Sequence, residues 1–230
     1  MPSLLYRSLA DLFFPRYCMG CDTRLSVDER LVCLTCRDEL YRLHLDWTDN
    51  FRLESWFADL AVKRVAGFTL FKQGGRAATL IHQLKYRNHP ELGEWMGHLA
   101  ATELTTSGLF EDVDVLIPIP LSSQRLRQRG YNQAEQIARG ISSVTAIPIS
   151  TRFLKRIADR ISQTHLGREE RMDNATRIFK LDAADELANK HVMVVDDVMT
   201  TGTTMDTAIM LLKDVPGINI SLFAWAWTME

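Results

Sequence analysis

The sequence predicts an α/β fold, with a mostly parallel sheet covered by helices on both faces and preceded by a small zinc ribbon. Beyond about residue 50, short apolar runs typical of buried strands alternate with segments whose apolar residues have helical spacing. Before residue 50, all four cysteines of the chain lie in two CxxC pairs. We therefore expect two units. Residues 1–50 hold an N-terminal helix, the ribbon and a linker, and residues 51–230 form the larger domain.

The composition is that of an ordinary globular protein. With 230 residues, 46% of them hydrophobic, the chain can bury a full core. A formal net charge of -2 excludes a protein that coats nucleic acid or anionic membrane with its whole surface, so any basic site is local. Arg7 and Asp11 interrupt the first apolar stretch, which we expect to form a short amphipathic helix. No run reaches the roughly 18 apolar residues of a spanning helix. We expect a cytoplasmic protein without membrane insertion.

The cysteine pairs predict a structural zinc site. The motifs CMGC and CLTC supply Cys18, Cys21, Cys33 and Cys36. Cysteines two positions apart can face one ion across a tight turn, and two such turns supply the tetrahedral sulfur shell that zinc prefers. The alternatives are a redox dithiol, two disulfides or chance, which a doubled motif without an export signal disfavours. Four sulfur ligands leave no position open for water. We expect a structural metal and a docking or capping role for the ribbon.

The elements of the larger domain follow from their hydrophobic patterns. The expected strands are Val65–Lys72, Val113–Leu121, His191–Asp197 and 218–227. The expected helices are Arg76–Tyr86, 91–104, 133–143 and 203–213. The basic segment between Leu121 and Gln133 is expected to be a polar loop.

The stretch VMVVDDVMTTGTTM, residues 192–205, combines a strand with a loop that suits a phosphate. In a parallel sheet, ligands bind beyond the carboxyl ends of the strands, where a loop leads into the next helix. Here that loop offers hydroxyls, backbone N–H groups and a glycine at a helix N-terminus. The candidate phosphate-binding residues are Thr200, Thr201, Gly202, Thr203 and Thr204.

Asp196 and Asp197 face a different part of the ligand. At an effective dielectric constant of about 20, two carboxylates beside a phosphate would repel it by several kcal/mol. Carboxylates accept hydrogen bonds from vicinal hydroxyls and hold magnesium through water, so the stretch describes a ribose 5-phosphate site. A receiver domain also ends a strand in two acids, but only 33 residues follow Asp197 here. A nucleotide P-loop is excluded because no lysine follows the glycine.

These motifs resemble a known family. VMVVDDVMTTGTT is similar to the phosphoribosyl pyrophosphate (PRPP) motif of type I phosphoribosyltransferases. Over nearly the whole chain, the sequence resembles the ComF family of bacterial proteins. The stretches that carry this resemblance are LKYRNHPELG, PIPLSSQRLRQRGYNQAEQIA, the double CxxC and the spaced set Arg160, Gln163, Leu166, Arg171 and Asn174.

The resemblance implies a type I phosphoribosyltransferase-like fold and a role for each segment. Asp196 and Asp197 would contact the ribose hydroxyls, with magnesium as a cofactor, and the threonine loop would bind the 5-phosphate. The turn IPIPLSS would be the counterpart of the pyrophosphate-binding loop.

Arg125, Arg127 and Arg129 supply cations that can neutralise a pyrophosphate or a nucleic-acid backbone. A solvated basic loop is the alternative. We expect the three arginines to bind a nucleic-acid backbone, because they are followed by Tyr131, an aromatic residue on which a base could stack. The segment TRFLKRIADR, with four basic residues and one acid, adds a second basic stretch.

Two functions from different classes remain open. Phosphoribosyl transfer needs magnesium, a cationic clamp and a placed nucleophile. By the resemblance, Thr200 stands where purine-salvage enzymes carry an aspartate base, which argues against a 6-oxopurine transferase but leaves a transferase for another base or amine open. We favour an accessory protein that binds PRPP or a related nucleotide in DNA handling, because the ComF family is associated with natural transformation and DNA utilisation. The expected partners are a sugar-phosphate or nucleotide ligand, single-stranded DNA and a DNA-translocating helicase-type protein.

Overall fold

The computed structural model describes residues 13–43, 62–157 and 178–228. Several expectations fall outside these stretches: most of the N-terminal helix, the domain boundary near residue 50, and the spaced set from Arg160 to Asn174. Within the described stretches, no helix has both the length and the hydropathy needed to cross a membrane.

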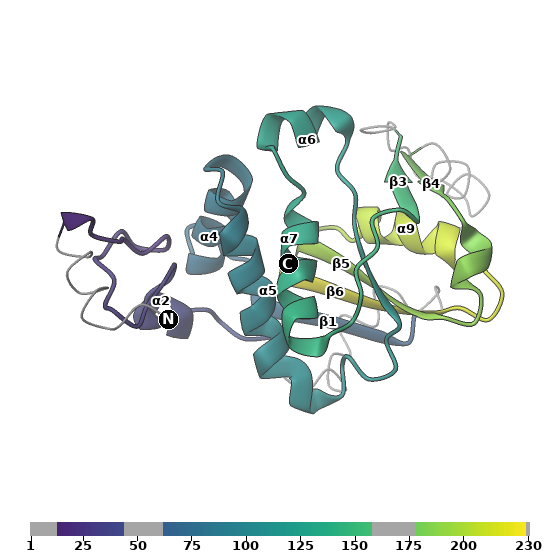
Figure 1. Cartoon of the computed structure of the whole chain (residues 1–230), viewed down its shortest axis with the longest axis horizontal. Coiled ribbons are helices and arrows are strands. Elements are labelled where there is room, and N and C mark those ends of the chain that lie inside the picture. The colour runs from purple at the N-terminus through teal and green to yellow at the C-terminus, as the bar shows by residue number, and fades with distance from the viewer. Residues whose placement is uncertain (1–12, 44–61, 158–177, 229–230) are drawn as a thin grey trace.

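Four parallel strands form the central sheet, in the order β1-β6-β5-β2 (Figure 1). This finding confirms the predicted parallel sheet. The two central strands, β5 and β6, are covered on both faces, which explains why their sequences are almost continuously apolar. The strands are β1 (Arg64–Leu70), β2 (Val115–Pro118), β5 (His191–Met199) and β6 (Asn219–Trp227).

Helices cover both faces of the sheet, as predicted (Figure 1). Successive strand side chains point to opposite faces, so the sheet contributes to two separate apolar clusters. One cluster includes α4 (Arg76–Tyr86), α5 (Pro90–Leu104) and α7 (Gln133–Thr145), and the other includes α9 (Thr203–Leu212). Two short 3₁₀ helices, Thr105–Ser107 and Ala184–Leu187, precede β2 and β5.

Helices α5 and α7 cross in direct backbone contact at two glycines. A Cβ atom on Gly97 would lie 1.9 Å from the carbonyl oxygen of Ile137. A Cβ atom on Gly140 would lie 2.1 Å from the carbonyl oxygen of Glu94. Only glycine fits at these positions, and the close crossing fixes α7 against the rest of this helical layer.

The segment expected to be a basic loop is instead helix α6 (Ser123–Arg129). Ser122 begins it, because its Oγ accepts a hydrogen bond from the backbone N–H of Arg125 at 3.3 Å. Gly130 ends it at φ 82°, in the left-handed region that glycine adopts without strain. The prediction was wrong because α6 buries no residue and so has no apolar stripe in its sequence.

Two further findings concern strands. The antiparallel hairpin of β3 (Leu154–Arg156) and β4 (Phe179–Leu181) lies outside the main sheet. Its strands are too short to produce a recognisable alternation in the sequence. Strand β5 continues to Met199, so Asp196 and Asp197 lie within the strand and not in the loop after it.

The cysteine-containing segment packs against α4 and α5. Arg76, the first residue of α4, donates a hydrogen bond to the carbonyl oxygen of Gly20 at 3.0 Å and pairs with Glu39. Arg42 pairs with Glu103 of α5 at 2.7 Å. Buried cysteines and residues of both helices belong to one apolar cluster, so the segment is attached to the larger domain by both polar and apolar contacts.

Residues 41–43 continue from this segment along the outer edge of β1. The backbone N–H of Leu43 donates to the carbonyl oxygen of Phe68 at 3.1 Å, and that of Leu70 donates to the carbonyl oxygen of Tyr41 at 3.0 Å. These residues therefore cover part of the outer edge of β1. The expected linker, residues 45–50, lies outside the described residues.

Candidate functional site

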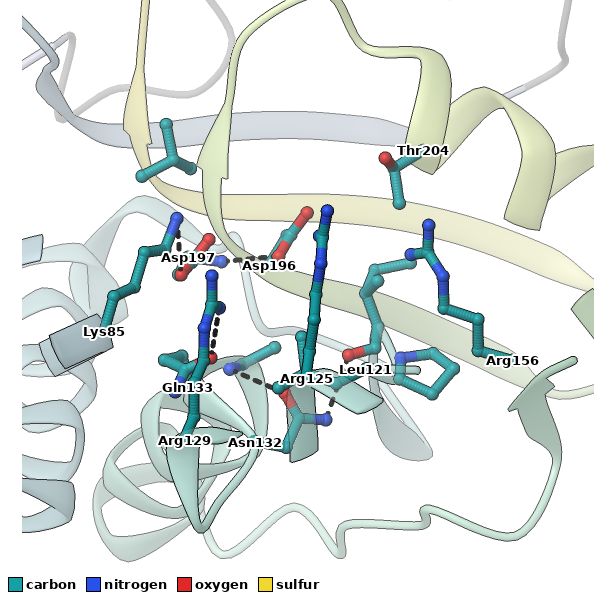
Figure 2. Close-up of a pocket in the computed structure, with 14 residues that line it drawn as sticks. Lys85, Leu121, Arg125, Arg129, Asn132, Gln133, Arg156, Asp196, Asp197 and Thr204 are labelled. Atoms are coloured by element: carbon teal, nitrogen blue, oxygen red, sulfur yellow. Dashed lines mark hydrogen bonds and ion pairs between the residues drawn. The ribbon is translucent and has the colours of Figure 1, made fainter. Parts of the chain in front are cut away.

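A pocket of about 140 Å³ lies at the carboxyl ends of β2 and β5 (Figure 2). Strand β5, helices α4, α6, α7 and α9, the β3–β4 hairpin and the turn after β2 all contribute to its lining. It is the edge of a parallel sheet at which α/β proteins bind their ligands. The charged lining residues are Lys85, Arg125, Arg129, Arg156, Asp196 and Asp197.

The acid pair is held by two polar contacts. The backbone N–H of Asp197 donates to Asp196 Oδ1 at 2.8 Å. Lys85 Nζ, which reaches the pocket from the last turn of α4, lies 3.0 Å from Asp197 Oδ2 (Figure 2). Because Asp197 is buried, this partner offsets much of the cost of removing its charge from water.

The carboxyl of Asp196 has a raised affinity for a proton. Burial raises the pKa of Asp196 to about 7, and the charge of Asp197 contributes to the same shift. The positive charges of Lys85 and Arg156 act in the opposite direction. Near neutral pH, Asp196 therefore exchanges a proton readily, and a cation bound beside the pair would favour its ionised form. The pair is chemically suited to hydrated magnesium and to sugar hydroxyls.

The threonine loop connects β5 to α9. Gly202 is the N-cap of α9 at φ 74°, a backbone conformation that favours glycine. The hydroxyls of Thr201 and Thr203 lie 3.0 Å apart. The first N–H groups of α9 have no acceptor within the helix and favour an anion. Among the described residues, Thr204 is the member of the predicted phosphate set that lines the pocket. Thr200, Thr201 and Gly202 lie in the adjoining loop, and Thr203 is the first residue of α9.

Helix α6 separates the three predicted arginines. Arg125 and Arg129 are four positions apart, share one face of the helix and both line the pocket (Figure 2). Arg129 Nη1 donates to Gln133 Oε1 at 2.8 Å, which orients the guanidinium. Arg127 is exposed and does not contribute to the described lining. A loop would leave the three equivalent, but the helix brings two of them to the acid pair and directs the third elsewhere.

The first turn of α7 also faces the pocket. Asn132 caps this helix, because its Oδ1 accepts a hydrogen bond from the N–H of Ala134 at 3.2 Å. Its Nδ2 donates to the carbonyl oxygen of Ile119 at 3.0 Å, which ties the cap to the turn IPIPLSS. Asn132, Gln133 and Ala134 line the pocket beside this turn. The positive ends of the α7 and α9 dipoles thus lie near the same space.

Two cations of the pocket were not assigned a role from the sequence. Lys85 lies in LKYRNHPELG, which supported only the family resemblance, and its contact with Asp197 depends on the packing of α4. Arg156 was counted with the second basic stretch, but it lines the pocket, and its guanidinium lies 5.3 Å from the ring centroid of Phe179. Figure 2 shows Lys85 and Arg156 entering from opposite sides, with Arg125 between them.

Within the described part of that basic stretch, which ends at residue 157, two further basic residues are paired with acids. Arg152 pairs with Glu186, and Lys155 Nζ lies 2.6 Å from Asp182 Oδ2. These acids follow β4 and neutralise the basic residues locally. The stretch therefore gives less support to nucleic-acid binding than its sequence indicated.

The expectation that a base stacks on Tyr131 is wrong. The side chain is buried, with 9% of the residue exposed, and its hydroxyl donates to the carbonyl oxygen of Leu84. Burial also raises the pKa of the phenol. Tyr131 anchors the segment between α6 and α7 to the end of α4 and presents no ring face to a ligand.

The four cysteines converge on one point, with all Sγ atoms within 4.8 Å of one another. The Sγ atoms of Cys21 and Cys33 are 3.7 Å apart, close to the value of about 3.8 Å for a tetrahedron with Zn–S bonds of about 2.3 Å. Cys18 Sγ accepts hydrogen bonds from the N–H groups of Gly20 and Cys33 at 3.3 and 3.2 Å. Gly20 is required, because a Cβ atom there would lie 2.9 Å from Cys36 Sγ.

The thiols of this cluster have different proton affinities. Hydrogen bonding with Thr23 lowers the pKa of Cys21 to about 6. Burial raises the pKa of Cys33, which immediately precedes helix α2 (Leu34–Asp38), and that of Cys36 within the helix. A bound divalent cation would favour the thiolate form of all four. The donor set and its geometry fit a closed tetrahedral metal site.

Comparison with known proteins supports the family resemblance. A family model described as phosphoribosyl transferase domain matches residues 84–217. Competence protein F of Haemophilus influenzae is 29% identical over 151 residues, which cover 64% of this chain and 66% of that protein. The DNA utilization protein YhgH of Salmonella typhimurium is 28% identical over 140 residues, which cover 59% of this chain and 60% of that protein. The matches thus span less than two thirds of these relatives' length.

A solved structure is also similar in part. The crystal structure of a purine phosphoribosyltransferase from Pyrococcus horikoshii matches 59% of this chain and 85% of its own, with 18% sequence identity and a TM-score of 0.36. At that TM-score the similarity is too low to support any transfer of function.

Proposed function

The chain belongs to the phosphoribosyltransferase domain family and, with its four-cysteine cluster, to the ComF/YhgH group, and from this premise we propose that its pocket binds PRPP or a related ribose 5-phosphate together with magnesium. We propose further that the protein uses this ligand in DNA handling. The names of the relatives, competence protein F and DNA utilization protein YhgH, support the second step.

One observation carries the proposal for the ligand: four cations, two carboxylates and two helix N-termini surround the same space. The cations and helix ends suit the phosphates of a sugar phosphate. Asp196 and Asp197 suit its hydroxyls and a hydrated magnesium ion. Magnesium, when bound, would supply positive charge against the pyrophosphate. Arg125 and Arg129 are placed to neutralise the remaining charge.

The proposed DNA role includes single-stranded DNA and a DNA-translocating helicase-type protein as partners, in the cytoplasm. The position of Arg127 supports a nucleic-acid contact outside the pocket, because this exposed arginine lies away from the pocket face of α6. Only the phosphate backbone is needed for such a contact, so we expect it to be independent of sequence.

A second function, magnesium-dependent transfer of the phosphoribosyl group to a base or amine, is favoured by the position of Arg125 and Arg129. They face the acid pair across one pocket, where they could stabilise a departing pyrophosphate. This placement gives the enzyme hypothesis more support than the sequence did. Asp196, whose pKa is raised to about 7, is the candidate proton acceptor among the described lining residues.

The cysteine cluster is proposed to hold one structural zinc ion through Cys18, Cys21, Cys33 and Cys36. All four donors are sulfur, so the ion would have no open position for chemistry. A structural zinc contributes on the order of 10 kcal/mol to folding, enough to stabilise a segment too short to bury a sufficient core of its own.

Calorimetric titration of PRPP, with and without magnesium, tests the ligand. Replacing both Arg125 and Arg129 with glutamine should weaken PRPP binding by tenfold or more, because each charge-assisted hydrogen bond is worth about 1.5–3 kcal/mol. Arg127→Gln is the matched control on the same helix and should change the affinity by less than about twofold, since an exposed charge contributes little. Equal losses in the double variant and the control would contradict the pocket assignment.

Pyrophosphate release distinguishes the two functions. Incubation of PRPP and magnesium with a panel of bases and amines should release no pyrophosphate if the protein binds PRPP only as an accessory. Release that Asp196→Asn abolishes would establish the transferase and replace the accessory function.

A further inference from the structure

We propose that Tyr86 and His82 form an aromatic platform on which the bases of single-stranded DNA stack at the rim of the pocket. This inference rests on the proposed function and names the surface by which the protein would meet the DNA. Tyr86 takes the stacking role that the sequence suggested for Tyr131, because the ring of Tyr86 is exposed whereas that of Tyr131 is buried.

The platform lies on one face of α4. His82 and Tyr86 are four positions apart and therefore adjacent on the helix surface. Their ring centroids are 4.9 Å apart with an interplanar angle of 45°. Both residues are exposed, and Tyr86 leaves 60% of its surface open to solvent. Two neighbouring exposed rings are a surface that can accept a flat partner.

Arg129 connects the platform to the pocket. Its guanidinium lies 5.7 Å from the ring centroid of Tyr86, within the range of a cation–π interaction. The same side chain lines the pocket, and Lys85, the residue before Tyr86, pairs with Asp197 inside it. A nucleotide carries a base and a phosphate on one sugar. A phosphate on Arg129 therefore brings its base within reach of the Tyr86 ring.

The charges around the platform favour a polyanion. Exposed Arg87 follows Tyr86 directly. Glu91, an acid near this end of α4, shares a hydrogen bond with His89 at 2.9 Å. Phosphates that follow one another along a strand would find two cations near the ring, Arg129 over its face and Arg87 as the next residue of the chain.

The openness of the platform favours a strand over a free nucleotide. Sites for small molecules are concave and bury most of their ligand. Tyr86, in contrast, faces solvent, as do the aromatic platforms that bind single strands without sequence preference. A strand can use such an open ring because its other nucleotides supply the remaining contacts.

Fluorescence anisotropy of the full-length metal-loaded protein with a labelled oligothymidine of about 15 nucleotides tests the platform. Tyr86→Ala should weaken binding about 5- to 100-fold, the loss expected for one stacked base. Tyr86→Phe keeps the ring and should bind like the wild type. Tyr41→Ala removes a tyrosine that is 68% exposed and lies outside the pocket lining, and it should leave the affinity unchanged.

The inference would be overturned if the wild type does not bind the oligonucleotide, or if Tyr86→Ala and Tyr41→Ala bind it with equal affinity. It would also be overturned if Tyr86→Phe loses as much affinity as Tyr86→Ala. Thymidine monophosphate that competes as well as the oligonucleotide would assign the platform to a free nucleotide and also overturn it. PRPP titration of Tyr86→Ala should match the wild type. A protein that binds the oligonucleotide through Tyr86 but does not bind PRPP would contradict the proposed ligand and leave the platform standing.

Discussion

Lys85 Nζ lies 3.0 Å from Asp197 Oδ2, and this ion pair joins helix α4 to strand β5 inside the pocket. Both side chains are largely shielded from solvent, so their attraction is screened less than that of a surface pair. The pair also influences Asp196, because the charge of Lys85 lowers the pKa of that carboxyl. Lys85 therefore favours the ionised form of Asp196, against the effects of burial and of Asp197.

Replacing Lys85 with glutamine should raise the pKa of Asp196 further above its usual range, because a stabilising positive charge is lost. Carboxyl ¹³C NMR titration measures this change. Lys155→Gln removes a lysine from an ion pair with Asp182 outside the pocket lining and serves as the control. An unchanged titration of Asp196 in Lys85→Gln would show that the ion pair does not govern the acid pair.

Magnesium binding should strengthen as the pH rises from about 6 to 8. The metal requires ionised carboxylates, and the pKa of Asp196 is raised to about 7. Below this pKa, each bound ion releases up to one proton, so the affinity rises by at most about tenfold per pH unit. Calorimetry in buffers of different ionisation enthalpy counts the released protons. Asp196→Asn should remove the pH dependence, and its persistence would assign the titration to another group.

Folding stability should show the opposite trend with pH. Asp196 has a pKa of about 7 in the folded protein against an ordinary value of 3.8, so the folded state binds more protons between these values. Its contribution therefore lowers the free energy of unfolding as the pH rises through this window. Urea denaturation of the wild type and Asp196→Asn at several pH values between 4 and 8 isolates this contribution. Parallel curves for the two proteins would contradict it.

Gly97→Ala should destabilise the protein by about 2 kcal/mol or more, because its Cβ would overlap the backbone of α7 and force α5 and α7 apart. At an exposed helical position, the same change stabilises a protein by about 1 kcal/mol. The sign of the effect in denaturant unfolding is therefore decisive. Gly140→Ala should behave in the same way, since it meets α5 across the same crossing.

Elemental analysis of protein purified under reducing conditions should find one zinc ion per chain. Cys18→Ser should lose the metal and expose part of the apolar cluster shared with α4 and α5. Hydrogen exchange should then accelerate in residues 13–43 and α4, while the central strands β5 and β6 keep their protection. Thr35→Ala, an exposed change in α2, should retain the metal. Wild-type protein that contains no metal, yet is as well protected from exchange in residues 13–43 and α4 as expected for the metal-bound protein, would contradict the zinc assignment.

The sequence predicted the central fold because burial leaves a strong periodic pattern. The bounds of α4 were predicted residue for residue, and β5 differs only at its end. Helix α6 was missed because it buries no residue, and the β3–β4 hairpin because each strand has three residues. Local patterns predict elements that have an apolar face, but they do not identify short elements that lie on the surface.

The site was predicted as far as its residues are adjacent in the sequence. Asp196 and Asp197 directly follow an apolar run of the sequence within β5, and the cysteine pairs have the spacing of metal ligands. The contact of Lys85 with Asp197 depends on the packing of two elements far apart in the chain, and no local pattern contains it. Tyr131 was misjudged for the same reason, because its burial against Leu84 is a tertiary contact.

Helix α4 is attached at its first residue, Arg76, to the cysteine-containing segment and carries Lys85 in its last turn. Its eleven residues span only about 16 Å. One helix therefore connects the cysteine-containing segment directly to the acid pair. If metal binding at the cysteine cluster raises the affinity of the pocket for its ligand by some factor, thermodynamic reciprocity requires ligand binding to raise the affinity of the cluster for the metal by the same factor.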